Sequence, residues 1–169
     1  DASHDQVFVD AMGDAASQCI ANVAQKAREN PEGRGMAAAF SMWVGCWPRA
    51  YLLHVAGGRC YRLRGGNLTR VTTDDHEPAQ RAPVSYSTGL ASTSAVVYRL
   101  DQSWDNVVLL CTEELAKYVT EEQIQKRLLG VTSAEDVCHD LLKDAREAGA
   151  TDSITMILGR TRPIVRRPV

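Results

Sequence analysis

The sequence predicts an α+β domain built around mainly antiparallel sheets. Short segments rich in β-forming residues cluster in the middle of the chain, and segments with the helical spacing of apolar residues lie on both sides of them. The pair Gly57-Gly58 between two such β segments favours a tight hairpin, because glycine adopts positive φ angles easily. The length of 169 residues suits one domain. We expect this domain over residues 1–162, followed by a mobile tail over 163–169.

The first third of the chain predicts a short strand and then a helix. Residues 6–10 (Q-V-F-V-D) form a β-rich run. From residue 13 to 29 the apolar positions Ala16, Ile20, Val23 and Ala27 recur at helical spacing. The sequence N-P-E-G at 30–33 then ends the helix, because proline cannot continue it and glycine suits a turn.

The remaining elements follow from alternation, turn residues and capping signals. Strands are expected at 38–44, 49–56, 59–64, 68–71, 95–100, 107–111 and 153–158, with the polar stretch 72–93 as a loop. Residues 120–123 (T-E-E-Q) have the form of a capping box and open a helix to about residue 129. A second helix begins at Ser133 and ends at Gly149, a natural C-terminal stop.

Composition excludes several classes of protein. The chain has 19 Lys and Arg against 21 Asp and Glu, so its net charge of −2 argues against a nucleic-acid-binding protein. The sequence contains no apolar stretch long enough to cross a membrane. The five cysteines are irregularly spaced, without a C-x-x-C pair, and no signal peptide opens the chain. These features favour a reducing, cytoplasmic environment, although the chain begins at Asp1 rather than Met.

Four segments, in this order, resemble the metal-dependent protein phosphatases of type 2C. Residues 10–14 (D-A-M-G-D) are similar to the family's D-G-M-G-G, and residues 54–61 (H-V-A-G-G-R-C-Y) to its x-V-G-D-S-R-x-Y. Residues 109–115 (L-L-C-T-E-E-L) are similar to L-L-C-S-D-G-L, and residues 151–155 (T-D-S-I-T) to D-N-I-T. The resemblance implies an α-β-β-α four-layer sandwich with two antiparallel sheets. It also implies two Mg²⁺ or Mn²⁺ ions that activate a water for attack on phosphoserine or phosphothreonine.

The same resemblance implies a degenerate metal site. Asp10 and Asp152 match metal-binding aspartates, Ala11 replaces a glycine whose carbonyl contributes, and Glu113 replaces an aspartate. Arg59 matches a motif arginine for which we expect a structural ion pair. Other expected groups are missing: a glycine replaces a motif aspartate at 57, a glutamate replaces a glycine at 114, and the family's N-terminal strand with its phosphate-binding arginine is absent.

The leading hypothesis is therefore a pseudophosphatase that binds a protein partner or a phosphorylated protein segment. We expect it to hold at most one Mg²⁺ or Mn²⁺ ion, near Asp10 and Asp152, or none. The alternatives are an active or weakly active phosphatase and a purely structural interaction module. The residues also have simpler interpretations: Asp10 as a helix cap, Asp152 as a turn residue, and Glu113 with its neighbour as the solvated first turn of a helix.

Overall fold

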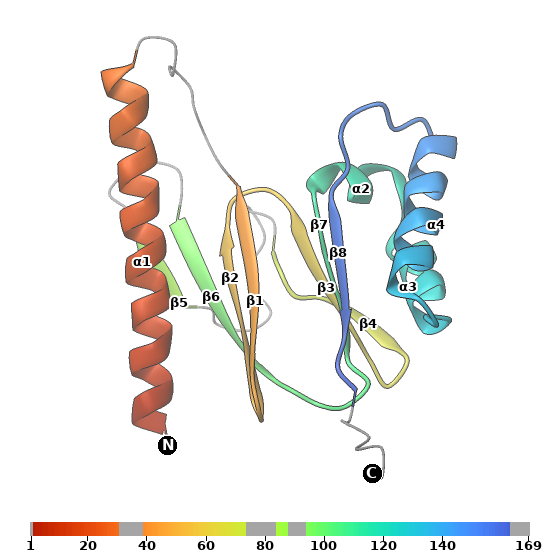
Figure 1. The fold of residues 1–169 in the computed structure, drawn as a ribbon, viewed down its shortest axis with the longest axis horizontal. Coiled ribbons are helices and arrows are strands. Elements are labelled where there is room, and N and C mark those ends of the chain that lie inside the picture. Colours follow the sequence, from red (N-terminus) through yellow and green to blue (C-terminus); the bar gives the residue numbers. More distant parts are fainter. Residues whose placement is uncertain (1, 31–38, 74–83, 88–93, 163–169) are drawn as a thin grey trace, which may run out of the picture. The chain divides into compact units, whose positions relative to one another are not determined.

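The computed structural model describes residues 2–30, 39–73, 84–87 and 94–162 (Figure 1). Its internal contacts divide the chain into two compact units. Unit 1 comprises Asp1–Gly57 and Asp74–Asp101, and unit 2 comprises Gly58–Thr73 and Gln102–Val169. Each unit is an antiparallel four-stranded sheet with one or more helices packed on it, so the α+β class predicted from the sequence is confirmed. The single domain expected over 1–162 stays a prediction.

Unit 1 contains one helix and one sheet. The strands are β1 (Phe40–Cys46), β2 (Arg49–Val55), β5 (Val84–Ser87) and β6 (Ser94–Asp101), in the order β1-β2-β6-β5. The helix α1 (Ala2–Glu29) packs on β2, β5 and β6. Alternate residues of β2 and β6 face it, because side chains alternate between the two faces of a strand. The resulting core contains Val9, Met12, Ala16, Tyr51, Leu53, Val55, Ala95 and Val97.

Helix α1 corrects the prediction for the start of the chain. Residues 6–10 are not a strand, because α1 runs without interruption from Ala2 to Glu29. The buried residues Val9, Met12 and Ala16 lie three and four positions apart, which places them on one helical face against the sheet. The helical period thus extends further toward the N-terminus than the short β-rich run suggested.

Unit 2 contains the other sheet and three helices. Its strands are β3 (Arg59–Arg64), β4 (Asn67–Arg70), β7 (Val107–Cys111) and β8 (Met156–Arg160), in the order β4-β3-β7-β8. Its helices are α2 (Glu113–Tyr118), α3 (Glu121–Leu129) and α4 (Ala134–Glu147). All three contact the sheet or one another and close a core that includes Tyr61, Leu109, Leu115, Ile124, Leu128 and Leu141.

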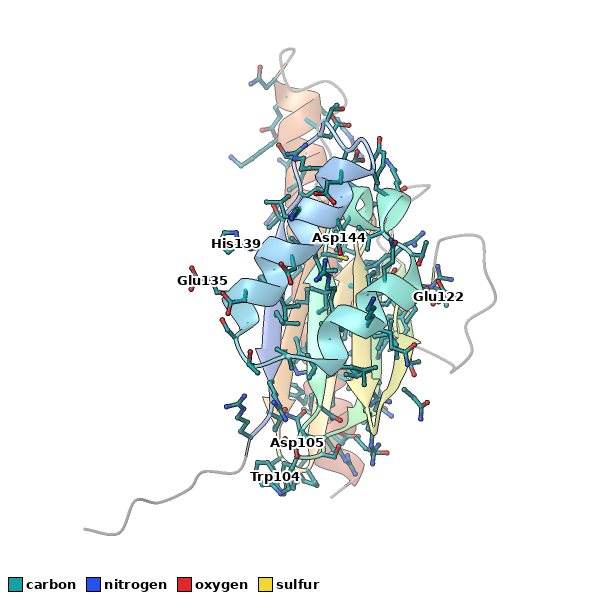
Figure 2. All side chains as sticks on the ribbon, turned by 90° about the vertical axis from the view of Figure 1, so that its right-hand side faces the viewer. Trp104, Asp105, Glu122, Glu135, His139 and Asp144 are labelled. Carbon is teal, nitrogen blue, oxygen red and sulfur yellow. The ribbon has the colours of Figure 1, made fainter. Side chains whose placement is uncertain are left out.

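A branched ion pair joins helices α3 and α4. Arg127 of α3 donates two hydrogen bonds to Asp144, from Nε at 2.8 Å and from one terminal nitrogen at 2.7 Å, and a third to Asp140 at 2.9 Å. This fork matches the planar geometry of a carboxylate. Asp144 lies on the inner side of α4, whereas Glu135 and His139 point into solvent, as Figure 2 shows.

The glycine turn after β2 does not form the predicted hairpin. Strand β2 pairs with β1 and β6, whereas β3 pairs with β4 and β7, so the turn leads the chain from one sheet to the other. Three consecutive residues there have positive φ: Ala56 at 44°, Gly57 at 36° and Gly58 at 94°. Glycine at the last two positions adopts this left-handed backbone without the steric cost of a Cβ.

The other expected elements are present, with shifted ends. Strand β8 begins at Met156 rather than at residue 153, and β5 lies within the stretch expected to be a loop. The rest of that stretch up to residue 93, apart from residues 72 and 73, lies outside the described residues, as does the expected tail. None of the helices within the described part of the chain is both long and apolar enough to span a membrane.

Candidate functional site

The structure places the two N-terminal candidates inside a helix. Asp10 lies in the third turn of α1 and accepts a hydrogen bond of 2.7 Å from the side-chain amide of Gln6, one turn earlier. The expected position of Asp10 at a strand-to-helix junction is therefore wrong, and so is the simpler alternative interpretation of Asp10 as a helix cap. The carbonyl of Ala11 belongs to the same helix, where each carbonyl accepts a hydrogen bond from the residue four positions on.

The C-terminal candidates belong to unit 2, at the end of the sheet where β7 leads into α2. Thr112 links this point to the segment before β8: its N–H donates to the carbonyl of Thr155 at 3.0 Å, and its hydroxyl accepts from the N–H of Thr155 at 3.2 Å. Thr112 is the residue before α2, but its hydroxyl makes no capping bond to that helix. The pair of bonds instead fixes Glu113 and the segment containing Asp152 to the same end of the sheet.

Glu113 and Glu114 form the first turn of α2, as the simpler interpretation of these residues predicts. Acidic residues are favoured there by the partial positive charge of the helix N-terminus. Their environments differ: the Glu113 side chain is 58% exposed, whereas that of Glu114 is only 11% exposed. Only one of the two carboxylates is therefore free to approach a solvent-borne ligand without rearrangement.

Lys117, which was not among the residues singled out from the sequence, lies close to both Glu113 and Glu114. The ammonium group of Lys117 lies 3.1 Å from the carboxylate of Glu114 and 4.0 Å from that of Glu113. The hydrogen bond that Lys117 donates to Glu114, with the negative charge of Glu114, raises the pKa of Lys117 above its usual value, and the charges of Glu113 and Asp152 add to this effect. Lys117 thus places a positive charge beside the carboxylates of Glu113 and Glu114 at this end of the sheet.

Arg59 and Asp152 complete the predicted set. Arg59 begins β3 and donates a hydrogen bond of 3.5 Å to the hydroxyl of Tyr61, two residues along the strand. The ion pair expected for Arg59 stays a prediction. Asp152 is exposed in the turn between α4 and β8, which is consistent with its interpretation as a turn residue. Its metal-binding role is untested, as are those of Asp10, Ala11 and Glu113.

Among the described residues of unit 2, no group of three metal-ligating side chains forms. Mg²⁺ requires about six oxygen ligands at about 2.0–2.1 Å, usually one or more carboxylates with several waters. Here the carboxylates of Glu113 and Glu114 both lie close to the ammonium group of Lys117. Across the part of the chain that the structure describes, no three side chains of His, Cys, Asp or Glu gather in a way that could hold a metal ion.

Lys117 could have been found from spacing alone. Glu113 and Glu114 precede it by four and three positions, and such pairs lie on the same side of a helix. A second polar contact, in unit 1, follows from strand register: Ser41 of β1 is opposite His54 of β2, and the Ser41 hydroxyl lies 2.9 Å from Nδ1 of His54. His54 is 7% exposed.

Comparison with known proteins gives consistent results for sequence and fold. No family model matches the chain. The serine/threonine protein phosphatase PstP of Mycobacterium tuberculosis is 25% identical over 169 residues, covering 85% of this chain and 32% of PstP. The chain therefore spans about a third of the length of the curated relatives it matches.

Solved structures with the same fold are also bacterial phosphatases. The catalytic domain of PstP in complex with two manganese ions aligns with a TM-score of 0.73 at 20% identity, over 89% of this chain and 70% of that one. PppA, a regulatory component of the type VI secretion system of Pseudomonas aeruginosa, aligns with a TM-score of 0.73 at 23% identity, over 90% and 69%.

These matches define the fold of the protein. The chain has the fold of the PPM-type serine/threonine phosphatases, and its sequence is similar, at 25% identity, to the serine/threonine phosphatase PstP. The family resemblance identified from four short motifs is thus confirmed. The first of those motifs was placed on residues that the structure shows in the middle of α1.

Proposed function

We propose that the chain is a type 2C-like module that binds a protein partner or a phosphorylated protein segment without hydrolysing phosphate. The observation that carries the proposal is the position of Lys117 between Glu113 and Glu114. Metal-dependent hydrolysis needs a divalent ion that lowers the pKa of a bound water. An ammonium group neutralises carboxylates but activates no water, so this arrangement favours retention of the fold without its hydrolytic chemistry.

The locations of the other candidates support the same proposal. A water-activating metal needs several oxygens in a nearly fixed geometry. The carboxylate of Asp10 is instead bonded to the side chain of Gln6, one turn earlier in the same helix. Gly57 carries no carboxylate, and its φ of 36° lies in a region that L side chains rarely adopt. We propose at most one weakly held Mg²⁺ or Mn²⁺ ion on this chain, or none.

The second candidate function is an active or weakly active Mg²⁺- or Mn²⁺-dependent serine/threonine phosphatase. It is favoured by the relatives: PstP is named a serine/threonine phosphatase, and its catalytic domain has been solved with two manganese ions. Under this alternative Glu113 would leave Lys117 and take part in metal binding. The two functions differ in turnover, which makes a direct test possible.

The test is phosphate release from a phosphothreonine peptide in the presence of millimolar Mn²⁺. We expect release at the rate of the buffer control, together with saturable binding of either the phosphorylated peptide or a partner protein. Turnover at about 1 s⁻¹ or faster, typical of enzymes, would overturn the proposal. The informative variant is Lys117→Gln. The matched control is Lys143→Gln, because Lys143 is also paired with a glutamate four positions away.

A further inference from the structure

In unit 2, the segment before β7 is bonded to the residue after β8, where the start of β7 and the end of β8 lie side by side (Figure 1). Val107, the first residue of β7, is opposite Arg160, the last residue of β8. Beyond this pair, the N–H of Asp105 donates to the carbonyl of Thr161 at 2.8 Å, and the N–H of Thr161 donates to the carbonyl of Asn106 at 2.9 Å. Two residues therefore oppose the single residue Thr161, which is the pattern of a β-bulge.

The first residue of this bulge, Asp105, has a left-handed backbone. Its φ is 62°, in a region that is uncommon for residues other than glycine, although aspartate tolerates it better than most. Its carboxylate pairs with Arg160 at 2.9 Å, and Figure 2 shows it beside Trp104 at this end of the sheet. Because a bulge re-aims the side chains next to it, the position of the following residue, Asn106, depends on this conformation.

The side-chain amide of Asn106 is buried with only half of its bonding capacity used. Asn106 is 1% exposed. Its Oδ1 accepts a hydrogen bond of 2.8 Å from the hydroxyl of Ser103. Its Nδ2 is buried and has no hydrogen-bond partner within the part of the chain that the structure describes. Buried amide groups are nearly always paired, because an unpaired donor loses its hydration without compensation.

A second amide in the same segment, that of Gln102, has the complementary deficit. Its Nε2 donates a hydrogen bond of 3.2 Å to the hydroxyl of Thr161. Its Oε1 is buried and, among the described residues, has no donor. The nitrogen of Asn106 thus lacks an acceptor, whereas the oxygen of Gln102 lacks a donor.

The two amides are brought together by Thr161. Asn106 is opposite Thr161 in the ladder, so their side chains share one face, and the hydroxyl on that side of Thr161 holds the amide of Gln102. A direct bond from Asn106 to Gln102 would satisfy both amides, but the two are not bonded to each other. A water molecule supplies what each one lacks, because it accepts from an N–H and donates to an oxygen.

The orientation of the two amides does not change this requirement. If the Gln102 amide were turned over, its oxygen would accept from the Thr161 hydroxyl and its nitrogen would be the unpaired atom. If the Asn106 amide were turned over, its nitrogen would donate to Ser103 and its oxygen would be unpaired. One buried atom of each amide needs a partner in every orientation, and water serves as donor and as acceptor.

From these observations we infer that unit 2 has a binding site for one internal water molecule, which bridges the amides of Gln102 and Asn106. The burial of both unpaired atoms excludes a larger ligand, whereas a single water needs little space and two to four polar partners. The bound water links the segment before the bulge to the bulge itself and so holds Asp105 in its left-handed conformation. The inference does not depend on whether the chain hydrolyses phosphate.

The first experiment is a high-resolution crystal structure of the full wild-type chain. We expect one ordered water at hydrogen-bond distance, about 2.7–3.2 Å, from the side-chain amides of both Gln102 and Asn106. A direct hydrogen bond between the two amides would overturn the inference, and so would a site without ordered water. This experiment needs no substitution, so its result does not depend on the folding of any variant.

The second experiment counts long-lived internal waters in solution by oxygen-17 relaxation dispersion. Gln102→Met removes one of the two amides and should lose one such water relative to wild type. The matched control is Gln125→Met, because Gln125 is a part-buried amide of the same unit that donates directly to the carbonyl of Gly66 at 2.8 Å. An unchanged count in Gln102→Met, or an equal loss in both variants, would overturn the inference.

Discussion

The functional interpretation depends on one residue, Lys117, and on the contacts of its ammonium group. This group holds a part-buried carboxylate, that of Glu114, at 3.1 Å and lies within 4.0 Å of a more exposed one, that of Glu113. An exposed ion pair of this kind contributes little to stability. Its consequence is electrostatic: a resident positive charge reduces the attraction of these carboxylates for a divalent cation.

A second charged group, Asp5, fixes α1 to its sheet. Its carboxylate accepts a hydrogen bond from the Tyr51 hydroxyl and pairs with Arg49 and Arg99. The Tyr51 hydrogen bond, with the bond and charge of Arg49, holds the pKa of Asp5 below its usual value although burial opposes this. Asp5 thus ties the first turns of α1 to β2 and β6.

The low pKa of Asp5 makes a stability prediction with a definite sign. A carboxyl group whose pKa is lower in the folded than in the unfolded chain stabilises above its unfolded value of about 3.9, and this contribution is lost as the pH falls through the folded value. Asp5→Asn should therefore lower the free energy of unfolding by about 1–3 kcal/mol at pH 7. The deficit should shrink below about pH 4.

Urea unfolding of wild type and Asp5→Asn at pH 7 and pH 3 measures this difference. Asp14→Asn changes an exposed carboxylate of the same helix and serves as the control. A deficit for Asp5→Asn of the same size at both pH values would contradict the account of this cluster.

At the scale of elements, capping signals and hydrophobic spacing predicted unit 2 well. The capping box predicted at residues 120–123 is present, with Thr120 accepting from the N–H of Gln123 and the Gln123 side chain accepting from the N–H of Thr120. The strands 59–64 and 107–111 also match β3 and β7. These features depend on local chemistry, which a single sequence displays directly.

The prediction failed where tertiary contacts decide the outcome. The run V-F-V at 7–9 favours a strand locally, but packing of Val9 and Met12 on the sheet stabilises a helix. Strand β5 has only four residues and lies in a polar stretch, so its pairing with β6 leaves no clear periodic signal. The glycine turn at 57–58 was predicted correctly as a turn, but the sheet that each flanking strand joins depends on long-range pairing.

The capping box gives a prediction about α3. Thr120→Ala removes one of the two reciprocal bonds and should lower the free energy of unfolding by about 1 kcal/mol, within a range of about 0.5–2 kcal/mol. Chemical denaturation followed by circular dichroism measures this loss. Thr132→Ala, an exposed threonine before α4 that caps no helix, should be nearly neutral. Equal effects of the two substitutions would show that the cap does not stabilise α3.

At the scale of the whole molecule, the fold class and the family resemblance follow from the sequence, but the functional site does not. The motifs around residues 113 and 152 were placed on the expected strand end and turn. The motif around residue 10 was placed between a strand predicted at 6–10 and a helix, whereas the structure places it within one continuous helix. Short motifs thus identify a fold when several occur in order, whereas each one is a weak guide to a ligand.

Calorimetric titration of Mn²⁺ into wild type, Lys117→Gln and Lys143→Gln tests the central claim most directly. If Lys117 is the resident cation of this site, wild type and Lys143→Gln should take up at most one weakly held ion. Lys117→Gln, in which Glu113 and Glu114 lose their positive partner, should bind Mn²⁺ at least tenfold more tightly. Two tightly bound ions on the wild-type chain, with no change in Lys117→Gln, would contradict the account.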